Sequence, residues 1–295
     1  MIDRRSVLGL VAGAVALSAT GAMAQDWKAK YPEIVFGKVP DENASGTMDR
    51  YAGLMEYLSK ELGTKVTLRI AQDYAAVIEG QRAGQIHIGM YGPAAYARAV
   101  MVGAKIEPIA IEVNEDGTKG YYSVFYVKKD SPYTKIEDLK GKNLGLVDPN
   151  STSGNNVPRF ALAKMGIEPE TWFGKVVYTG SHENAVIALG QGTVDVAANW
   201  WNDENESMLM RMERKGMAKY GDYRIIFKSE QIVNSPIAMM SDLPADLKKK
   251  IAEATLAYPA KDPEGFKKMT DGKAKPWQPI THDAYKPIME LNKFV

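Results

Sequence analysis

Short apolar runs alternate with stretches of helical periodicity along most of the chain. Between residues 51 and 62, apolar residues recur every three or four positions, which predicts a helix with one buried face that ends at Gly63. The apolar runs on either side of it, at 34–39 and 66–70, predict strands. A strand–helix–strand series of this kind favours an α/β fold with a mostly parallel sheet and helices on both faces.

Two such series follow one another and meet near residues 117–120. In the first series we expect strands at 34–39, 66–70, 86–90 and 106–113, and helices at 51–62, 74–83 and 94–102. In the second we expect strands at 121–128, 144–147, 176–178 and 194–198, and helices near 154–165, 182–189 and 204–215. Strand-like segments at 224–227 and 237–240 then close the sheets. The pattern predicts two α/β lobes, with the loops at the carboxyl ends of their strands meeting in a cleft.

Residues 1–24 have the pattern of a bacterial signal peptide. Arg4 and Arg5 precede an apolar stretch at 7–17, and the small-residue exit at 22–24 predicts cleavage before Gln25. This stretch is too short for a spanning helix, and no later segment approaches the roughly twenty apolar residues that a span needs. We therefore expect a periplasmic mature protein without a membrane span, exported by either the general secretory or the twin-arginine route.

Charge and cysteine content narrow the classes of function. The chain has 37 Lys and Arg against 36 Asp and Glu, so no basic excess attracts nucleic acid or an anionic membrane over long range. The absence of cysteine excludes disulfides and thiol chemistry. Three scattered histidines do not have the spacing of a metal site, so we expect no metal or cofactor and interpret His87 and His282 as structural.

The segment 148–154, Asp-Pro-Asn-Ser-Thr-Ser-Gly, contains the strongest signal for ligand chemistry. It follows an apolar strand and opens a helix, where the first backbone N–H groups are unpaired and carry partial positive charge. The hydroxyls of Ser151, Thr152 and Ser153 add further donors for an anion. Taken alone, the segment is more often an ordinary helix cap, in which Ser151 or Ser153 accepts from backbone N–H groups.

Together with the rest of the chain, this motif indicates a resemblance to a known protein family. The chain resembles the substrate-binding components of phosphonate, phosphite or phosphate ABC importers, which are type II periplasmic binding proteins. The most specific match is the segment 148–154 with the downstream Ser-His-Glu-Asn at 181–184. Further matches lie at 71–80, 88–92, 120–123 and 194–199, so the resemblance covers essentially the whole mature chain.

The resemblance implies two lobes joined by two crossovers, which we place near 117–121 and 229–234. The first lobe is expected to contain residues 25–119 and 232–295, and the second lobe residues 120–231. The implied partners are a small oxyanion, an ABC permease and the ATPase that powers it. No catalysis is expected, because the sequence has no Gly-x-Ser-x-Gly elbow, metal cluster, P-loop or dinucleotide fingerprint.

The resemblance places a phosphoryl group on Ser151, Thr152, Ser153 and His182. A tetrahedral oxyanion has many acceptor lone pairs, so a dry site must supply many donors. His182 can donate from a ring nitrogen, and it would add attraction if protonated. Without the resemblance, His182 is better explained as a helix-terminal residue satisfied by Glu183 or a backbone carbonyl.

Three tyrosines are candidates for contact with the same ligand, and only the resemblance distinguishes Tyr74 and Tyr121 from packing residues among the 15 tyrosines of the chain. Tyr74 begins a helix of the first lobe, and its hydroxyl can reach the anion from across the cleft. Tyr121 lies at the first crossover and can do so from the hinge. Tyr91 ends a strand where cleft residues belong, and ligand contact and core packing are equally good explanations for it.

Selectivity depends on what surrounds the outer end of the ligand. In similar proteins that prefer aminoethylphosphonate, two carboxylates receive the ammonium, and the matching positions here are Asn202 and Ser235. The missing carboxylates favour a small, neutral or anionic ligand. The alternative is a cationic phosphonate or phosphoester held by Trp200 or Trp201, by cation–π contact, with Asp203 and Glu204. These two acids are otherwise explained as the first turn of the helix expected at 204–215.

A binder of another oxyanion on the same fold is the remaining alternative. An amino-acid or sulfonate binder would keep the signal peptide and the two lobes, but it would not need the hydroxyl run at 151–153.

Overall fold

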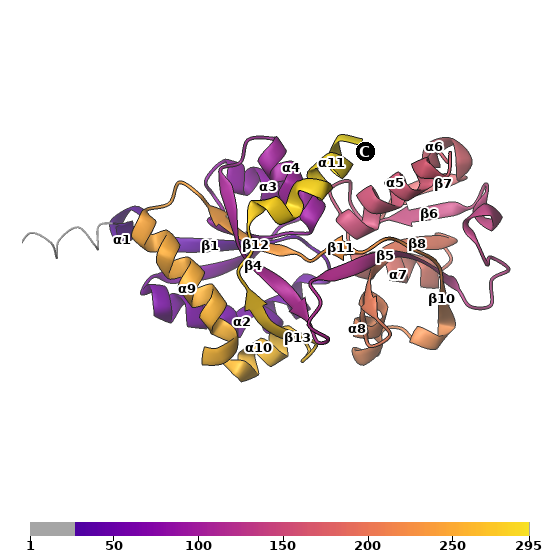
Figure 1. The fold of residues 1–295 in the computed structure, drawn as a ribbon. Coiled ribbons are helices and arrows are strands. Elements are labelled where there is room, and N and C mark those ends of the chain that lie inside the picture. The colour runs from indigo at the N-terminus through magenta and orange to yellow at the C-terminus, as the bar shows by residue number, and fades with distance from the viewer. Residues whose placement is uncertain (1–26, 295) are drawn as a thin grey trace, which may run out of the picture.

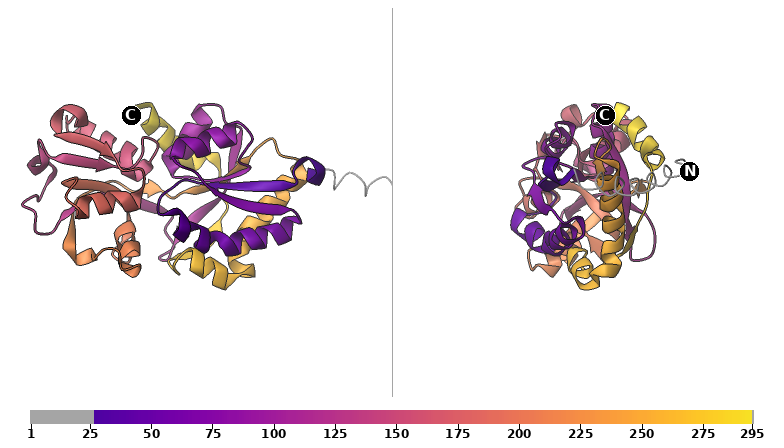
Figure 2. Two further views of the ribbon diagram at one scale, coloured as in Figure 1. Left: turned by 180° about the vertical axis from the view of Figure 1, so that it is seen from behind. Right: turned by 90° about the vertical axis from the view of Figure 1, so that its left-hand side faces the viewer.

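The computed structural model describes residues 27–294, which form two α/β lobes lying end to end (Figure 1). The signal peptide expected at residues 1–24, with its cleavage site, lies outside the described residues. Each lobe contains one sheet covered by helices (Figure 2). A cavity lined by residues of both lobes positions the candidate site.

The first lobe contains a six-stranded sheet of order β13-β4-β12-β3-β1-β2. Its strands are β1 (Glu33–Lys38), β2 (Lys65–Ile70), β3 (Ile88–Met90), β4 (Ile106–Asn114), β12 (Pro236–Met240) and β13 (Ala274–Gln278). Its helices are α1 (Trp27–Lys30), α2 (Ala44–Leu62), α3 (Tyr74–Arg82), α4 (Pro93–Met101), α9 (Ala245–Lys261), α10 (Pro263–Met269) and α11 (Lys286–Phe294), with a 3₁₀ turn η4 (His282–Tyr285).

The second lobe contains a sheet of order β10-β5-β8-β6-β7, to which two short strands are added: β11 beside β5 and β9 beside β8. Its strands are β5 (Gly120–Lys128), β6 (Asn143–Leu146), β7 (Lys175–Tyr178), β8 (Val196–Asp203), β9 (Glu206–Ser207), β10 (Tyr223–Lys228) and β11 (Ile232–Val233). Its helical elements are η1 (Ile136–Leu139), η2 (Thr152–Asn156), α5 (Val157–Lys164), α6 (Pro169–Trp172), α7 (His182–Gly190), α8 (Met208–Arg214) and η3 (Tyr220–Asp222).

The helix predicted to end at Gly63 shows why the apolar periodicity predicted this element correctly. In α2, Asn43 caps the N-terminus by accepting from the backbone N–H of Gly46 at 2.8 Å. Gly63 ends the helix in the left-handed conformation, with φ of 63°. The periodic residues between Tyr51 and Leu62 are buried against the sheet, although the helix begins seven residues before Tyr51.

The prediction of mostly parallel sheets is wrong, because both sheets are mixed. Strands β1, β2 and β3 pair in parallel as the local series predicts, but β12 is inserted between β3 and β4 and pairs antiparallel with both. In the second lobe β6 pairs in parallel with β7 and β8, whereas β5 is antiparallel to β8 and β10. Strands β12 and β5, with which the chain enters a lobe after a crossover, run opposite to the parallel strands, and β13 at the edge of the first sheet is likewise antiparallel to β4.

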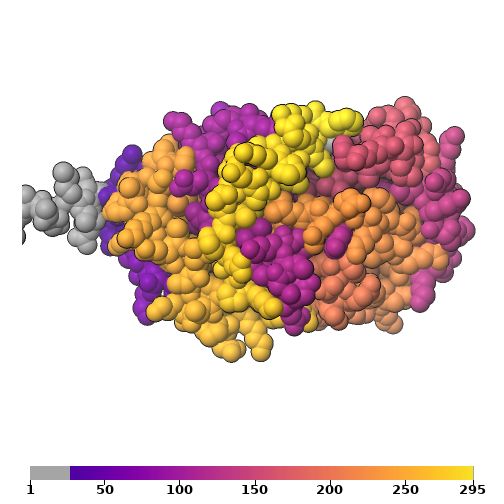
Figure 3. All heavy atoms as spheres, in the orientation of Figure 1, coloured from indigo at the N-terminus to yellow at the C-terminus, as the bar shows by residue number. Residues whose placement is uncertain are grey.

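The chain passes between the lobes twice, from β4 to β5 and from β11 to β12, and β11 pairs with the start of β5. The lobe bounds expected from the sequence, 25–119 with 232–295 and 120–231, stay a prediction. The C-terminal helix α11 lies over the junction of the lobes (yellow in Figure 3). There Asn292 accepts from Asn156 of the second lobe at 2.9 Å and donates to the carbonyl of Ala94 in the first at 2.8 Å.

Candidate functional site

The hydroxyl run begins a helical segment whose first turn is wider than an α-helix. Residues Thr152–Asn156 form a π-helical turn, η2, that continues directly into α5. The Ser151 hydroxyl caps this turn by accepting from the N–H of Gly154 at 3.1 Å, as the cap interpretation expects. A Cβ at Gly154 would lie 2.4 Å from Val147, so only glycine lets the turn pack this closely on the strand before it.

The same hydroxyl run is held from both lobes. The Thr152 hydroxyl accepts from the N–H of Ala94, at the start of α4 in the first lobe, at 2.8 Å. The Ser123 hydroxyl, on β5, donates to the carbonyl of Ser153 at 2.7 Å. The hydroxyls of Thr152 and Ser153 can still donate their own protons to a ligand. Within the described residues, the backbone N–H groups of Thr152 and Ser153 have no hydrogen-bond acceptor.

His182 is the first residue of α7 and is buried against the hydroxyl run. Its Nδ1 lies 3.1 Å from Oδ1 of Asn199, and its Nε2 lies 3.4 Å from the Ser151 hydroxyl. The Asn199 amide is oriented by two further bonds: Nδ2 donates to the His182 carbonyl at 2.9 Å, and Oδ1 accepts from the Trp200 N–H at 3.0 Å. Oδ1 is therefore an acceptor, which assigns the ring proton to Nδ1 and leaves Nε2 directed at Ser151.

Burial lowers the pKa of His182 to about 4, and the nearby Asp41 opposes that shift. The imidazole is therefore neutral at neutral pH in this structure. The attraction that a protonated His182 would add is absent unless a bound anion raises this pKa again.

The three candidate tyrosines differ in what their hydroxyls do. Tyr74 begins α3, and burial raises its pKa well above the ordinary value, while the Ser151 hydroxyl opposes the shift. Burial raises the pKa of Tyr121 to about 12, with the hydroxyls of Thr152 and Ser153 opposing. Both phenols are therefore protonated donors beside the hydroxyl run. The Tyr91 hydroxyl instead donates to Oε1 of Gln81, within the core of the first lobe.

A cavity of about 160 Å³ lies between the lobes and is lined by every site residue expected from the sequence. These are Tyr74, Tyr91, Tyr121, Ser151, Thr152, Ser153, His182, Asn202 and Ser235. The structure thus brings together residues from seven separate stretches of the chain. This volume is roughly ten times what one water needs, so the cavity has room beyond a bare phosphoryl group.

Asn202 and Ser235 lie in the cavity wall where the crossovers meet. Asn202 donates to Oδ1 of Asn114 at 3.1 Å, and Asn234 donates to the same oxygen at 3.0 Å. The Ser235 carbonyl accepts from the N–H of Glu112 at 3.4 Å. Both positions therefore lie at the hinge beside β4.

The proposed alternative pocket of Trp200, Trp201, Asp203 and Glu204 is not assembled. Trp200 lines the cavity, whereas Trp201 lies on the opposite face of β8 and packs on Tyr122, because successive strand residues alternate faces. Neither acid lines the cavity. Nor do they begin a helix as expected, since β8 runs to Asp203 and α8 begins only at Met208. Asp203 instead accepts from the N–H groups two and three residues later, which turns the chain into β9.

Sequence reasoning missed a set of charged residues that line the same cavity. They are Lys38, Asp41, Arg50, Glu112, Glu206, Arg211 and Lys273. They come from strand ends, helices and a loop that are far apart in sequence. No local motif marks them, and only the strand-end position of Lys38 offered a signal.

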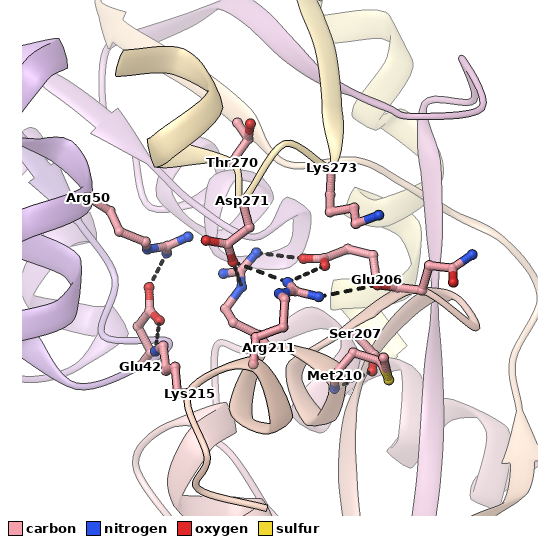
Figure 4. A network of polar contacts seen from close by, with 12 residues as sticks. Glu42, Arg50, Glu206, Ser207, Met210, Arg211, Lys215, Thr270, Asp271 and Lys273 are labelled. Atoms are coloured by element: carbon pink, nitrogen blue, oxygen red, sulfur yellow. Dashed lines mark hydrogen bonds and ion pairs between the residues drawn. The ribbon is translucent and has the colours of Figure 1, made fainter. Parts of the chain in front are cut away.

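Ion pairs connect the lobes (Figure 4). Lys215, after α8, lies 2.6 Å from Glu42, whose side chain is fully buried and also pairs with Arg50 of α2. Arg211 and Arg214 of α8 reach Asp271 of the first lobe at 3.4 and 3.1 Å. The carbonyl of Asp41 also accepts from the N–H of His182 at 3.1 Å. The lobes are therefore in direct contact across the cleft.

The comparisons with known proteins identify the family. Residues 36–285 match the family described as "ABC transporter, phosphonate, periplasmic substrate-binding protein". The chain belongs to this family.

Three relatives show how far the similarity extends. A phosphonates-binding periplasmic protein of Escherichia coli is 34% identical over 78% of this chain and 67% of its own length. A phosphate-import protein of Mycolicibacterium smegmatis is 31% identical over 70% of this chain and 66% of its own. A solved binding protein component of an ABC phosphonate transporter from Pseudomonas aeruginosa is 30% identical, with a TM-score of 0.80 over 89% of this chain and 86% of that one.

The family and the solved relative confirm the expected fold, a two-lobed type II periplasmic binding protein. Among residues 27–294, no helix has the length and apolarity needed to cross a membrane. The described part of the chain also has no group of three or more potential metal ligands. His87 accepts from the N–H of Val35 at 2.9 Å, and His282 contacts the Tyr96 hydroxyl at 2.9 Å, so each has a local structural partner.

Proposed function

We propose that this protein captures a phosphonate, phosphite or phosphate oxyanion in the periplasm and delivers it to an ABC permease powered by a separate ATPase. The observation that carries the proposal is the convergence of the hydroxyl run, His182, Tyr74 and Tyr121 on one cavity between two lobes. The family membership and the relatives that bind phosphonates or import phosphate support the same class of ligand.

The hydroxyl run provides the donors that a phosphoryl group needs. Ser151 and Thr152 each accept one backbone N–H, which orients the hydroxyl oxygen. The Thr152 proton is left for the ligand, whereas the Ser151 hydroxyl faces Nε2 of His182 and gives its proton to the ligand only when Nε2 is itself protonated. The unpaired N–H groups of Thr152 and Ser153 add two more donors. In this proposal the phosphoryl oxygens accept from these groups in a site that excludes most water, where charge-assisted hydrogen bonds are strong.

Tyr74 and Tyr121 make the capture dependent on both lobes. Tyr74 belongs to the first lobe, whereas the hydroxyl run belongs to the second, and Tyr121 lies where the first crossover enters the second lobe. A ligand that contacts both lobes binds the closed arrangement better than an open one, so it shifts the population toward closure. The closed form is the species we propose the permease recognises.

We propose no catalysis, although Ser151, His182 and Asn199 are arranged as a hydroxyl, an imidazole and an amide that orients it. A general base needs a pKa near the working pH, and burial lowers the pKa of His182 to about 4. This geometry serves to fix the hydroxyl and ring nitrogen as ligand partners. Phosphorus NMR of methylphosphonate incubated with the protein should show no new species, and turnover would contradict this point.

Calorimetric titration of ligand-stripped protein tests the proposed function. We expect saturable one-to-one binding of at least one of phosphate, phosphite and methylphosphonate. Binding of an alkanesulfonate or an amino acid, with no binding of any of the phosphorus compounds, would contradict the proposal and favour the other ligand classes of this fold.

A further inference from the structure

Among the charged side chains that line the cavity, one carboxylate has no partner within residues 27–294. In the part of the chain that the structure describes, every other charged side chain that lines the cavity pairs with an opposite charge. The pairs are Lys38 with Asp41, Arg50 with Glu42, Arg211 with Glu206, and Lys273 with Glu115. The carboxylate of Glu112 makes no hydrogen bond or ion pair within residues 27–294, although it lines the same cavity.

The backbone of Glu112 is fixed, so its side chain has a defined position. Its N–H donates to the Ser235 carbonyl at 3.4 Å, and its carbonyl accepts from the Asn234 amide at 3.0 Å. Two residues further along β4, Asn114 lies on the same face of the strand and binds Asn202. Glu112 therefore belongs to the wall that also contains Asn202 and Ser235.

Burial raises the pKa of Glu112, and the charges of Lys38 and Arg211 oppose this without cancelling it. The charge of Glu112 also adds to the burial that raises the pKa of Tyr121, so this carboxylate acts on a tyrosine of the proposed phosphoryl site. An unpaired carboxylate in such a place is unfavourable unless a ligand neutralises it.

We propose that Glu112 is a specificity-determining residue that receives an ammonium group on the substituent of the bound phosphonate. This inference rests on the proposed function, because it assumes that the phosphoryl group occupies the hydroxyl run. It assigns to the protein a zwitterionic ligand whose anionic end binds Ser151–Ser153 and whose cationic end faces β4. The volume of the cavity beyond a phosphoryl group accommodates such a substituent.

This inference replaces the selectivity expected from the sequence. That expectation rested on the absence of carboxylates at Asn202 and Ser235, and both positions are indeed uncharged. In the structure, Glu112 of β4 supplies a carboxylate to the same wall. The sequence-based expectation considered only positions 202 and 235 and therefore did not include it. Burying an ammonium beside Glu112 leaves neither charge unpaired.

Two ligands and two variants test the proposal on the full mature chain at mildly alkaline pH. The ligands are aminoethylphosphonate and propylphosphonate, which differ by exchange of the ammonium for a methyl group. The variants are Glu112→Gln and the control Glu107→Gln, which changes a carboxylate on the same strand that pairs with Lys248 and does not line the cavity. Thermal unfolding of each variant checks that it is folded.

We expect the unmodified protein and Glu107→Gln to bind aminoethylphosphonate at least tenfold more tightly than propylphosphonate. Glu112→Gln should bring the ratio close to one while changing the affinity for propylphosphonate by less than about threefold. A ratio near one in the unmodified protein, an unchanged ratio in Glu112→Gln, or an equal loss for both ligands would overturn the proposal. If methylphosphonate, phosphite or phosphate binds under any of these outcomes, the inference fails alone; if none of these phosphorus compounds binds, the proposed function fails with it.

Discussion

The ion pair between Lys215 and Glu42 connects the lobes, so removing it should weaken ligand binding without touching the ligand. The Nζ–Oε2 distance is 2.6 Å, the Glu42 side chain is fully buried, and 26% of the Lys215 side chain is exposed. Burial acts to raise the pKa of Glu42, but surrounding cations outweigh it and the pKa is lowered, so the carboxylate is ionised. In Lys215→Met, Glu42 keeps only Arg50 as a close partner.

The size of the effect follows from this geometry. Because Glu42 retains one cation, the loss should be smaller than that for a fully orphaned buried charge and comparable to one charge-assisted hydrogen bond, about 1.5 to 2.5 kcal/mol. If the ligand-free protein is mostly open, the whole of this loss appears in the binding free energy. The affinity for methylphosphonate should then fall roughly 10- to 60-fold.

Calorimetric titration measures this effect, and Lys248→Met is the matched control. Lys248 pairs with Glu107 within the first lobe, and 27% of its side chain is exposed, much like Lys215. The control should bind within about twofold of the unmodified protein, because an exposed pair inside one lobe contributes little and does not depend on closure. Equal affinities for Lys215→Met and Lys248→Met would refute the reasoning that contacts between the lobes stabilise the ligand-bound state.

Three further predictions concern single residues of the cavity. Thr152→Val removes a hydroxyl but keeps the shape, so titration should show a roughly 10- to 100-fold loss of phosphonate affinity, with Thr152→Ser close to normal; equal affinities would exclude the hydroxyl as a donor. Tyr91→Phe should bind within about threefold but unfold at lower temperature, because Gln81 loses its partner; a large loss of affinity with normal stability would instead make Tyr91 a ligand donor. His182 has a pKa of about 4, below its unfolded value, so the unfolded state binds more protons between pH 4 and about 6.5. The stability of the unmodified protein should therefore decline by about 3 kcal/mol as pH falls through this range, and urea unfolding of His182→Gln should lack this component; parallel pH profiles would contradict the assignment.

Local patterns predicted the helices and strands well, because these elements depend mainly on residues that are neighbours in the sequence. The periodicity that ends at Gly63 and the hydroxyl run after an apolar strand both have local physical causes, namely a left-handed C-cap and an N-terminal cap. The mixed sheets could not be predicted in the same way. The insertion of β12 between β3 and β4 depends on a strand more than a hundred residues away from either.

The candidate site likewise contains residues that the sequence could predict and residues that it could not. The residues that the family resemblance points to, such as Ser151 and His182, lie in contiguous motifs, and the structure gathers them around one cavity. Glu112 and Arg211 belong to no motif, because their presence in the cavity results from how β4 and α8 are placed in the folded protein. The prediction for Asp203 failed since its side chain bonds to backbone N–H groups and forms a turn, which competes with helix formation.

A crystal structure with bound methylphosphonate would test the central claim most directly. The account predicts closed lobes, with phosphoryl oxygens within hydrogen-bond distance of the Thr152 hydroxyl, the Tyr74 hydroxyl and Nε2 of a His182 whose pKa the bound anion has raised, and with the methyl group directed toward β4. A phosphoryl group bound instead among Arg50 and Arg211, away from the Thr152 hydroxyl, would contradict the account.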